Sequence, residues 1–402
     1  MVKLTPVDEV LSYIQEKVIK VDEECIDLSA GLGRVLSRDI RSNIDVPSFN
    51  NSAMDGYAIS ADGIAAGAKL NISDRIPAGS VGQSLLPGTA ARIFTGAPMP
   101  TGADTVVMQE NTTLVQNAVV NNEVIINEDP KMGQNVRLAG QDTKAGSTLL
   151  SAGRRLRAQD LGLIASVGCA EISVYRKLRV AVLSTGDELI SPSEKCLPGQ
   201  IYNSNQYTLL ALIEQLGMLA IDMGCIGDSF SETEKALIEA ELSADCIISS
   251  GGVSVGEEDY VKAVVEKLGK LDLWKLAIKP GKPLAFGQVG NTPFFGLPGN
   301  PVSSFVTFSI VARPYLMLCQ GCVEGHLMKM AAQSDFDFKG GSRKEYLRVR
   351  LNINEEGRSI ASLFQNQGSG VMSSLSWADG LAEVEIDQEI SSGDLVSVNL
   401  LN

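Results

Sequence analysis

The chain has 402 residues, which is too long for one ordinary domain and predicts about two to four domains. Its residues are 44% hydrophobic and 20% charged, so sizeable cores can form and extensive disorder is not expected. The formal net charge is −14, from 34 basic and 48 acidic residues, which argues against non-specific nucleic-acid binding because that binding needs a basic surface.

The N-terminal part of the chain is predicted to be helical. Apolar residues recur near helical spacing in Pro6 to Val21 and again in Asp27 to Arg41. The segment Val46 to Asn51 breaks this pattern and indicates a domain boundary.

The next part, residues 47–141, alternates short β-type runs with Gly, Pro, Asn and Asp, which predicts a compact β domain. Residues 142–172 contain a predicted helix, Ala158 to Val167, followed by a strand. We expect residues 1–46 and 142–172 to form one elongated domain, into which the β domain is inserted.

The central part, residues 173–326, has the pattern of an α/β domain. The apolar run Arg179 to Leu183 suits a strand covered on both faces, and helical and strand-like segments alternate after it. A long helix opens at Pro301 and is expected to kink at Pro314. Residues 327–402 alternate again and predict a C-terminal β domain. The fold class is therefore α/β multidomain, with a mostly parallel central sheet.

Four glycine-rich loops within the central part each follow a short apolar run. Ligands bind at such strand ends in open parallel sheets, because backbone N–H groups and helix N-termini point outward there. The loops are Ser184 to Glu188, Ser249 to Gly256, Lys279 to Pro283 and Gly296 to Pro301.

Carboxylates follow three successive strands of this predicted sheet. Asp187 and Glu188 follow the first strand, Asp228 follows the second, and Asp259 closes an acidic run after the third. A single acid near a helix start is usually a cap. Three at successive strand ends favour a site for Mg²⁺ or a polar ligand.

Lysines and small residues indicate that the ligand is an anion. Lys275 and Lys279 are four residues apart in a strand-like run, so we expect both to project to one face, and Lys282 adds a third charge. A solvated edge strand is the alternative. The Ser249 to Gly256 loop offers many N–H groups and suits phosphate binding.

The cysteines and the histidine limit the possible chemistry. Seven scattered cysteines indicate reduced thiols, and the N-terminus has no segment of signal-peptide type, so we expect a cytoplasmic protein. No uninterrupted apolar run is long enough to span a bilayer. The single histidine, His326, excludes a Ser/His/Asp triad. Proton transfer would fall to carboxylates, lysines or metal-bound water.

Six motifs together resemble the molybdopterin molybdenumtransferase family, the molybdenum-insertion enzymes of molybdenum cofactor biosynthesis, which are related to the E domain of gephyrin. The likeness covers essentially the whole chain in the expected order. The motifs are Asn51 to Ala58, Thr95 to Pro98, Ser184 to Leu189, Ser249 to Gly256, Lys279 to Pro283 and Gly296 to Ser303.

The resemblance implies insertion of molybdate into adenylylated molybdopterin, with release of AMP and dependence on Mg²⁺. It implies an elongated homodimer of four-domain chains, and a molybdopterin adenylyltransferase as a further partner. The active cleft would lie between the α/β and C-terminal domains of one subunit and the β domain of the other. By motif, Asp55 and Thr95 would come from the partner's β domain, and Asp142 would lie near the cleft.

The resemblance also assigns roles to residues of the cleft. Glu188, Asp228 and Asp259 match acids around the metal and the ligand, and which of them binds Mg²⁺ is open. Lysines 275 and 279 match the pterin-phosphate side. The expected cradle for molybdate consists of Lys279, Lys282, Ser303, Arg348 and Ser369, with Arg350 as the alternative to Arg348. The motifs add Ser250, Gly251, Gly252, Ser254, Pro298 and Pro301 as substrate-binding residues.

Two other functions fit the same sequence features. A non-catalytic dimeric scaffold could use the same fold, because a fold alone does not establish activity. A molybdopterin adenylyltransferase would need only the α/β part, and the flanking domains argue against it. Retention of the charged cleft residues favours the molybdenum-inserting enzyme.

Overall fold

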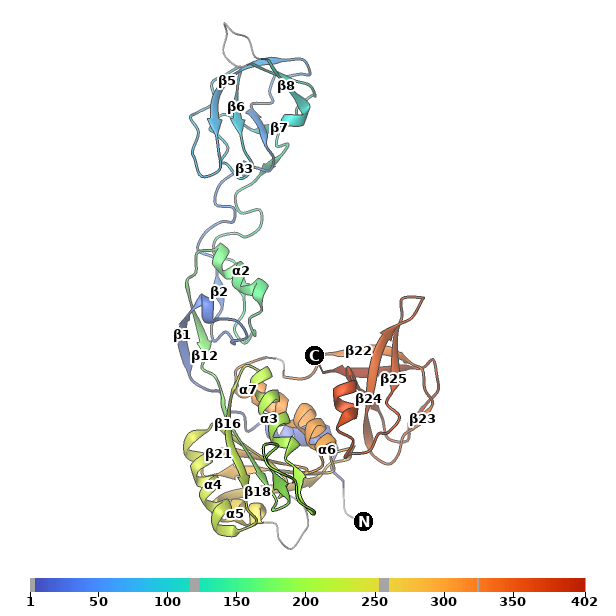
Figure 1. Ribbon diagram of the computed structural model, residues 1–402. Helices are drawn as coiled ribbons and strands as arrows, with labels where there is room; N and C mark the ends of the chain where they lie inside the picture. Colours follow the sequence, from blue (N-terminus) through green and yellow to red (C-terminus); the bar gives the residue numbers. More distant parts are fainter. Residues whose placement is uncertain (1–3, 116–122, 253–259, 324, 402) are drawn as a thin grey trace.

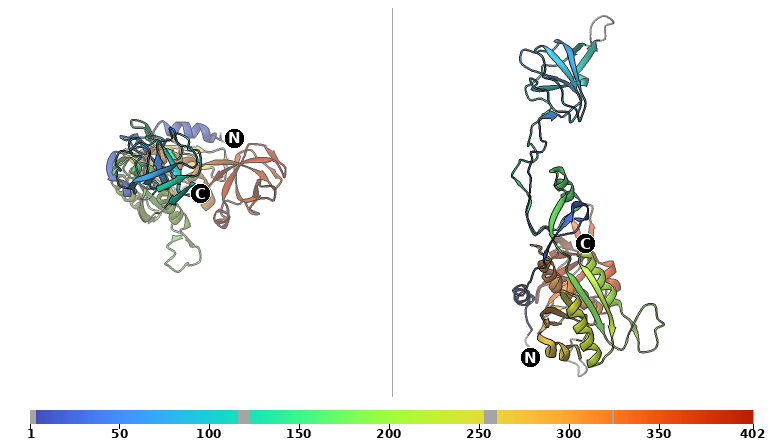
Figure 2. Two further views of the ribbon diagram at one scale, coloured as in Figure 1. Left: turned by 90° about the horizontal axis from the view of Figure 1, so that it is seen from above. Right: turned by 90° about the vertical axis from the view of Figure 1, so that its left-hand side faces the viewer.

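The computed structural model describes residues 4–115, 123–252, 260–323 and 325–401 (Figure 1). The molecule is elongated: a β domain stands at one end, a slender middle segment follows, and an α/β domain with a C-terminal β domain beside it forms the other end (Figures 1 and 2). The chain enters the distal β domain and returns from it through the middle segment, so this domain is an insertion.

The α/β domain is built on a six-stranded sheet in the order β16-β13-β17-β21-β20-β18. The first four strands are parallel, as predicted, whereas β20 and β18 run antiparallel at one edge. The strands are β13 (Arg179–Thr185), β16 (Leu219–Ile226), β17 (Cys246–Ser250), β18 (Gly269–Lys275), β20 (Pro283–Val289) and β21 (Thr292–Leu297). A short pair, β14 (Leu189–Ile190) and β15 (Ile201–Tyr202), lies outside this sheet.

Helices cover both faces of this sheet because its strands are apolar on both sides. Val180 and Val182 pack with α1, α3, α6 and α7, whereas Ala181 and Leu183 pack with α4 and α5. The helices are α1 (Val7–Gln15), α3 (Ser204–Gln215), α4 (Phe230–Ser243), α5 (Tyr260–Leu268), α6 (Pro301–Thr307) and α7 (Arg313–Cys319).

The long helix expected from Pro301 is present but changes its winding. A π-helical stretch, η3 (Phe308–Ala312), separates α6 from α7 immediately before Pro314. A proline inside a helix removes one backbone donor, and the wider π turn accommodates this loss. By length and composition Pro301–Cys319 is a candidate membrane span, contrary to our sequence estimate, but 83% of its apolar window is buried inside the protein, as in a core helix.

The middle segment pairs the chain entering the distal domain with the chain leaving it. Strand β1 (Glu23–Asp27) pairs with β12 (Glu171–Tyr175), and β2 (Ile40–Arg41) pairs with β11 (Thr148–Leu150). Apolar residues of these strands, such as Leu150 and Val174, form a small core, and helix α2 (Ala158–Ser166) packs on it through Ile164.

Two expectations about the N-terminal part were wrong. In the stretch Asp27 to Arg41 the helical part is only a 3₁₀ turn, η1 (Leu28–Ala30), and the stretch ends in strand β2; its apolar residues pack mostly from an irregular chain against β12 and α2. Helix α1 does not join residues 142–172: its apolar face, including Val10 and Ile14, packs in the core of the α/β domain.

The distal domain contains a six-stranded sheet in the order β7-β4-β6-β5-β9-β8 and a short pair, β3 with β10. Its strands are β3 (Asn51–Ser52), β4 (Gly56–Ile59), β5 (Lys69–Ile76), β6 (Thr89–Ile93), β7 (Thr105–Met108), β8 (Thr112–Val115), β9 (Glu123–Ile126) and β10 (Val136–Arg137). A 3₁₀ turn, η2 (Gln109–Asn111), joins β7 to β8.

The C-terminal domain is a closed barrel, because β24 pairs with both β25 and β26 while β22 and β28 complete the ring. Strand β19 (Ile278–Lys279) leaves the α/β domain and pairs with β24, which ties the two domains together. The elements are β22 (Lys329–Ser334), β23 (Phe338–Lys339), β24 (Lys344–Ile353), β25 (Ser359–Leu363), α8 (Ser373–Trp377), β26 (Gly380–Val384), β27 (Glu389–Ile390) and β28 (Leu395–Leu400).

Candidate functional site

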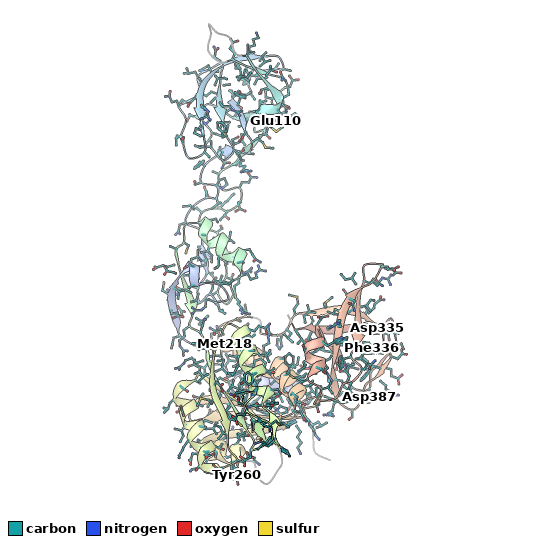
Figure 3. All side chains as sticks on the ribbon, in the orientation of Figure 1. Glu110, Met218, Tyr260, Asp335, Phe336 and Asp387 are labelled. Atoms are coloured by element: carbon teal, nitrogen blue, oxygen red, sulfur yellow. The ribbon has the colours of Figure 1, made fainter. Side chains whose placement is uncertain are left out.

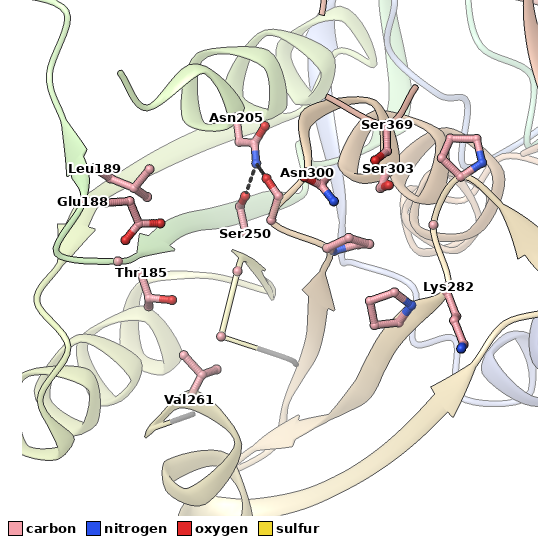
Figure 4. Close-up of a pocket in the computed structure, with 18 of the residues that line it drawn as sticks. Thr185, Glu188, Leu189, Asn205, Ser250, Val261, Lys282, Asn300, Ser303 and Ser369 are labelled. Carbon is pink, nitrogen blue, oxygen red and sulfur yellow. Dashed lines mark hydrogen bonds between the residues drawn. The ribbon is translucent and has the colours of Figure 1, made fainter. Parts of the chain in front are cut away.

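A cleft of about 850 Å³ lies where the carboxyl ends of the parallel strands face the C-terminal barrel (Figure 4). The loops after β13, β16, β17 and β21 line one side, and loops of the barrel line the other. The structure brings together ten of the predicted site residues along this cleft: Glu188, Asp228, Ser250, Gly251, Gly252, Lys279, Lys282, Pro298, Ser303 and Ser369.

The acidic side of the cleft is formed by two neighbouring strand ends. The backbone N–H of Asp228 donates to Oδ1 of Asp187 at 3.0 Å, and the N–H of Asp187 faces Oδ2 of Asp228 at 3.3 Å. Partial burial raises the pKa of the Cys225 thiol, and the carboxylates of Glu188, Asp228 and Asp187 raise it further. Asp187 and Asp228 thus contact each other at the edge of the sheet, and Glu188 follows Asp187 in the same loop.

The donor chemistry of this side fits Mg²⁺. Magnesium prefers oxygen ligands and is usually held by one or two carboxylates together with water and substrate phosphates. Glu188 and Asp228 line the cleft and supply two such carboxylates. No group of three His, Cys, Asp or Glu side chains suited to a metal occurs among the residues that the structure describes. Two further predicted residues, Ser254 and Asp259, lie outside the described residues.

Asn205 joins two of the loops that form the floor of the cleft. It lies in the first turn of α3, and its amide donates to Oγ of Ser250 at 2.7 Å and to the carbonyl of Gly299 at 2.8 Å (Figure 4). Gly251 and Gly252 have φ of 91° and 66°, which favour glycine. This loop therefore presents backbone without bulky side chains.

The basic side of the cleft carries Lys279, Lys282 and Arg343. The Lys279 ammonium lies 3.0 Å from Oε2 of Glu345, whose side chain is only 5% exposed. Arg343 donates to the carbonyl of Ile278 at 2.9 Å. Glu188 and Lys282 lie on opposite sides of the cleft (Figure 4).

Lys275 does not share a face with Lys279, contrary to our prediction, and it does not line this cleft. Strand β18 ends at Lys275, where the chain leaves the α/β sheet. The N–H of Leu276 then donates to the carbonyl of Lys282 at 2.6 Å, and Lys279 joins the barrel sheet. The two lysines thus belong to different sheets.

Two serines lie where the barrel meets the start of α6. The N–H of Val302 donates to the carbonyl of Ser369 at 3.0 Å, which fixes the barrel loop beside Ser303. The two serine side chains face each other in Figure 4. Pro301 begins the helix next to them but does not line the cleft itself.

Arg348 lies behind the cleft and does not line it, which corrects the expectation of direct ligand contact. The residue is fully buried, and burial lowers the pKa of its guanidinium to about 10. It donates to Oγ of Ser374 at 3.1 Å and to the carbonyl of Gly368 at 3.3 Å. Arg350, the alternative, stacks on Trp377 and also lies outside the cleft.

Asp55 and Thr95 contact each other in the distal domain. Oδ1 of Asp55 accepts from both the N–H and the hydroxyl of Thr95 at 2.8 Å, and these hydrogen bonds lower the pKa of Asp55. Asp142 lies in the middle segment, where its N–H donates to the carbonyl of Val46. Within one chain the distal domain, marked by Glu110, and the cleft, marked by Tyr260, lie at opposite ends (Figure 3).

Sequence reasoning did not single out several polar residues that line the cleft. They include Asn205, Asn300, Arg343 and Gln367. Asn205 and Asn300 stand beside helix starts after strands, a position that could have indicated them. Gln367 holds Arg348 through its side chain, a contact between distant parts of the chain that the sequence does not signal.

Three family descriptions match the chain in the order of its domains. Residues 5–168 match the MoeA N-terminal region (domain I and II). Residues 181–318 match a probable molybdopterin binding domain, which contains most of the cleft. Residues 331–401 match the MoeA C-terminal region (domain IV).

Full-length relatives agree with these matches. The chain is 40% identical to a molybdopterin molybdenumtransferase of Haemophilus influenzae over 94% of both chains. It is 37% identical to one of Nostoc sp., over 94% of this chain and 88% of the relative. The crystal structure of the molybdopterin biosynthesis MoeA protein from Pyrococcus horikoshii OT3 matches 99% of this chain and 100% of its own with a TM-score of 0.83 at 29% identity. The chain therefore belongs to the molybdopterin molybdenumtransferase family and acts in molybdenum cofactor biosynthesis.

Proposed function

We propose that this protein inserts molybdate into adenylylated molybdopterin and releases AMP. The observation that carries the proposal is the charge separation across one cleft: Glu188 and Asp228 line one side, and Lys279, Lys282 and Arg343 line the other. A ligand that combines a pyrophosphate with an attached oxyanion needs both sides.

Molybdate is a tetrahedral dianion, and the basic side suits it. The ammonium of Lys282 and the hydroxyls of Ser303 and Ser369 all reach the cleft. Arg348 contributes indirectly, because it holds the carbonyl of Gly368 next to Ser369. We assign Arg348 as a positioning residue for this loop.

The pyrophosphate of the substrate would lie against the loop of Ser250 to Gly252. Loops with small side chains present their N–H groups to phosphate oxygens. Asn205 keeps this loop at a fixed place relative to Gly299, so the phosphate site is formed before the ligand arrives. A molybdate oxygen would attack the phosphorus on the pterin side and form a bond to it, while the bridging P–O bond breaks and AMP leaves with the electron pair. Lys279 and Lys282 would neutralise the charge on the departing oxygen.

Glu188 and Asp228 would hold Mg²⁺ together with water and the phosphates. When bound there, the ion supplies charge neutralisation on the pyrophosphate oxygens. Asp187 keeps Asp228 in place through the paired backbone contacts between the two loops.

The distal domain would serve the cleft of a second copy in a homodimer. The distal domain, to which Asp55 and Thr95 belong, lies at the opposite end of the molecule from the cleft of its own chain (Figures 1 and 3). A mixture of Asp55→Ala and Asp228→Asn chains tests this. If the subunits share sites, mixed dimers regain activity that neither variant has alone, and no recovery after subunit exchange would contradict the dimer.

The reaction itself is tested by adding molybdate and Mg²⁺ to the protein with adenylylated molybdopterin and measuring AMP. Asp228→Asn and Lys282→Met should each lose at least about tenfold in rate, as expected when one electrostatic contact is removed. Lys339→Met, which removes a lysine paired with Glu389 on the barrel surface, is the matched control. Full AMP release in both cleft variants would overturn the assignment.

Two rivals give different results in this assay. If the protein were a non-catalytic scaffold, even the wild-type protein would release no AMP. A molybdopterin adenylyltransferase would consume ATP without added adenylylated substrate. We propose such an enzyme as the partner that supplies the substrate rather than as the activity of this chain, because the cleft is completed by barrel residues such as Ser369 and Arg343.

A further inference from the structure

A second cavity, of about 700 Å³, lies where three parts of the chain meet. The middle segment contributes Arg155, the C-terminal part contributes Leu327, Met328, Leu400 and Leu401, and the α/β domain contributes the rest. It shares no lining residue with the candidate active cleft. Cavities of roughly 300–1,000 Å³ at domain junctions are the usual sites for small organic ligands.

The cavity lies at the far ends of the two helices that also reach the active cleft. Helix α3 has Asn205 at the cleft and Gln215 at the cavity. The long helix has Ser303 at the cleft and Arg313 at the cavity. Helices α3 and α7 lie near the C-terminus in Figure 1.

The formal charges that line this cavity are positive. Arg155 and Arg313 carry them, His326 also lines the cavity, and no acidic side chain does among the lining residues that the structure describes. Both guanidinium groups face the same cavity. In agreement with this, burial lowers the pKa of Arg313, and the charge of Arg155 lowers it further. This is unexpected in a chain with a net charge of −14.

The described contacts of both arginines are with backbone carbonyls. Arg155 donates to the carbonyl of Gln215 at 2.8 Å and to that of Gly33 at 3.3 Å. Arg313 donates to the carbonyl of Gly325. Neither forms an ion pair within the part of the chain that the structure describes. Two guanidinium groups that line one cavity and whose described hydrogen bonds go only to neutral carbonyls favour an anionic ligand, because a charge-assisted hydrogen bond to a carboxylate or phosphate is stronger than one to a neutral carbonyl.

The remaining wall of the cavity is apolar. Leucine, phenylalanine, valine and methionine side chains surround the arginines, with Ser309 and Gln15 as further polar groups. The rim residues Val323 and Met328 are 76% and 73% exposed, so the cavity is open to solvent. A ligand that fills it needs an apolar body in addition to its charge.

We propose that this cavity binds a small organic anion, with its carboxylate or phosphate between Arg155 and Arg313 and its apolar body against the leucines. The site is independent of the molybdenum-insertion reaction proposed above. Helix α3 and the long helix that begins at Pro301 both contribute residues to this cavity and to the active cleft.

Calorimetric titration of the full-length protein with octanoate tests the proposal, with 1-octanol and octylamine as neutral and cationic analogues. Octanoate should bind once per chain, and both analogues should bind at least about tenfold more weakly, because only an anion pairs with the arginines. Equal binding of octanoate and octylamine, or no binding of octanoate, would overturn the proposal.

Variants separate this site from others. Arg155→Met and Arg313→Met should each weaken octanoate binding at least about tenfold, as should Met328→Glu, which adds an acid at an exposed rim position and so preserves the fold. Lys282→Met in the active cleft and Arg75→Met in the distal domain should leave it unchanged. Unchanged affinity in Met328→Glu and in a folded arginine variant would refute the site.

One acid that neighbours two lining residues in the sequence needs its own control. Glu324 stands between the lining residues Val323 and Gly325 in the sequence and lies outside the described residues. If Glu324→Gln binds octanoate and the wild type does not, the arginines are already neutralised by their own chain and the proposal fails. If the wild type binds octanoate, and the affinity of Glu324→Gln for octanoate is less than about threefold higher, the proposal is supported.

Discussion

Lys279 and Glu345 form an ion pair across the junction of the α/β domain and the barrel, with 3.0 Å between Nζ and Oε2. The two residues are direct partners in the parallel pairing of β19 with β24. The Glu345 carboxylate is buried and also accepts from the N–H of Gly341 at 3.2 Å, whereas half of the lysine side chain is exposed. The barrel thus positions a lysine that belongs to the α/β chain segment and lines the active cleft.

This asymmetry in burial predicts unequal costs of breaking the pair. Lys279→Met leaves a buried carboxylate without its cation and should lower the free energy of unfolding by about 2 kcal/mol. Glu345→Gln leaves an ammonium that water can still reach and should cost only about 1 kcal/mol. Urea unfolding of both variants and the double variant measures the difference. A larger loss in Glu345→Gln than in Lys279→Met would contradict this assignment of burial.

Asn205 offers a test of the loop geometry in the cleft. Asn205→Ala removes both hydrogen bonds that join Ser250 to Gly299, so the phosphate-binding loop loses its fixed position. We expect AMP release to fall about tenfold, mostly in kcat, while stability changes by about 1 kcal/mol or less. Asn205→Asp keeps an oxygen but loses the amide donor and should not restore the rate. A wild-type rate in Asn205→Ala would show that the bridge has no catalytic role.

The strand ends of the α/β domain could be predicted because apolar β-branched runs and glycine turns are local signals. Glu188 and Asp228 therefore fell into the cleft as expected. The relation of Lys275 to Lys279 could not be predicted in this way. Between them the chain leaves one sheet for another, and the backbone partners that cause this, such as the carbonyl of Lys282, come from a later turn.

The barrel side of the cleft was harder to predict for the same reason. Arg348 and Arg343 stand on the same strand region and look equivalent in the sequence. Gln367 and Ser374, which come later in the chain, contact Arg348 where it is buried. Arg343 has no such cover among the residues that the structure describes, and it lines the cleft. Helix α1 likewise has a clear helical pattern, but nothing in its sequence says that its partner is the α/β sheet.

Gly281 is predicted to be essential for the conformation of the lysine loop. Its φ is 107°, and a Cβ there would lie 2.5 Å from Oγ1 of Thr307, which is fully buried. Gly281→Ala should lower the free energy of unfolding by about 1–2 kcal/mol from backbone strain alone, with the steric clash adding to this. Thermal or urea unfolding measures the loss, and AMP release should fall because Lys282 is the next residue.

A double variant separates the two causes. Thr307→Ala removes the clashing hydroxyl, so Gly281→Ala combined with Thr307→Ala should regain the steric part of the loss and keep the backbone part. Complete recovery would mean that the positive φ costs nothing here, and no recovery would mean that Thr307 does not crowd Gly281.

Asp245 predicts a dependence of stability on acid pH. Burial alone would raise its pKa, but hydrogen bonds from Arg176 and Arg179 outweigh burial and hold the pKa well below its usual range. The folded state therefore binds the proton more weakly than the unfolded chain. The stabilisation is complete above about pH 4, near the unfolded pKa, and is lost as the pH falls further.

Asp245→Asn should thus lower the free energy of unfolding at pH 7 by about 2 kcal/mol and flatten its decline below pH 4. Asp22→Asn is the matched control, because Asp22 contacts the same Arg176 at 3.5 Å but is 90% exposed. That control should change stability by less than about 0.5 kcal/mol. Urea unfolding between pH 7 and pH 3 measures all three proteins. If the free energy of unfolding falls equally steeply with pH in the wild type and in Asp245→Asn, then this carboxylate does not determine the acid sensitivity of the protein, although it joins the starts of β13 and β17.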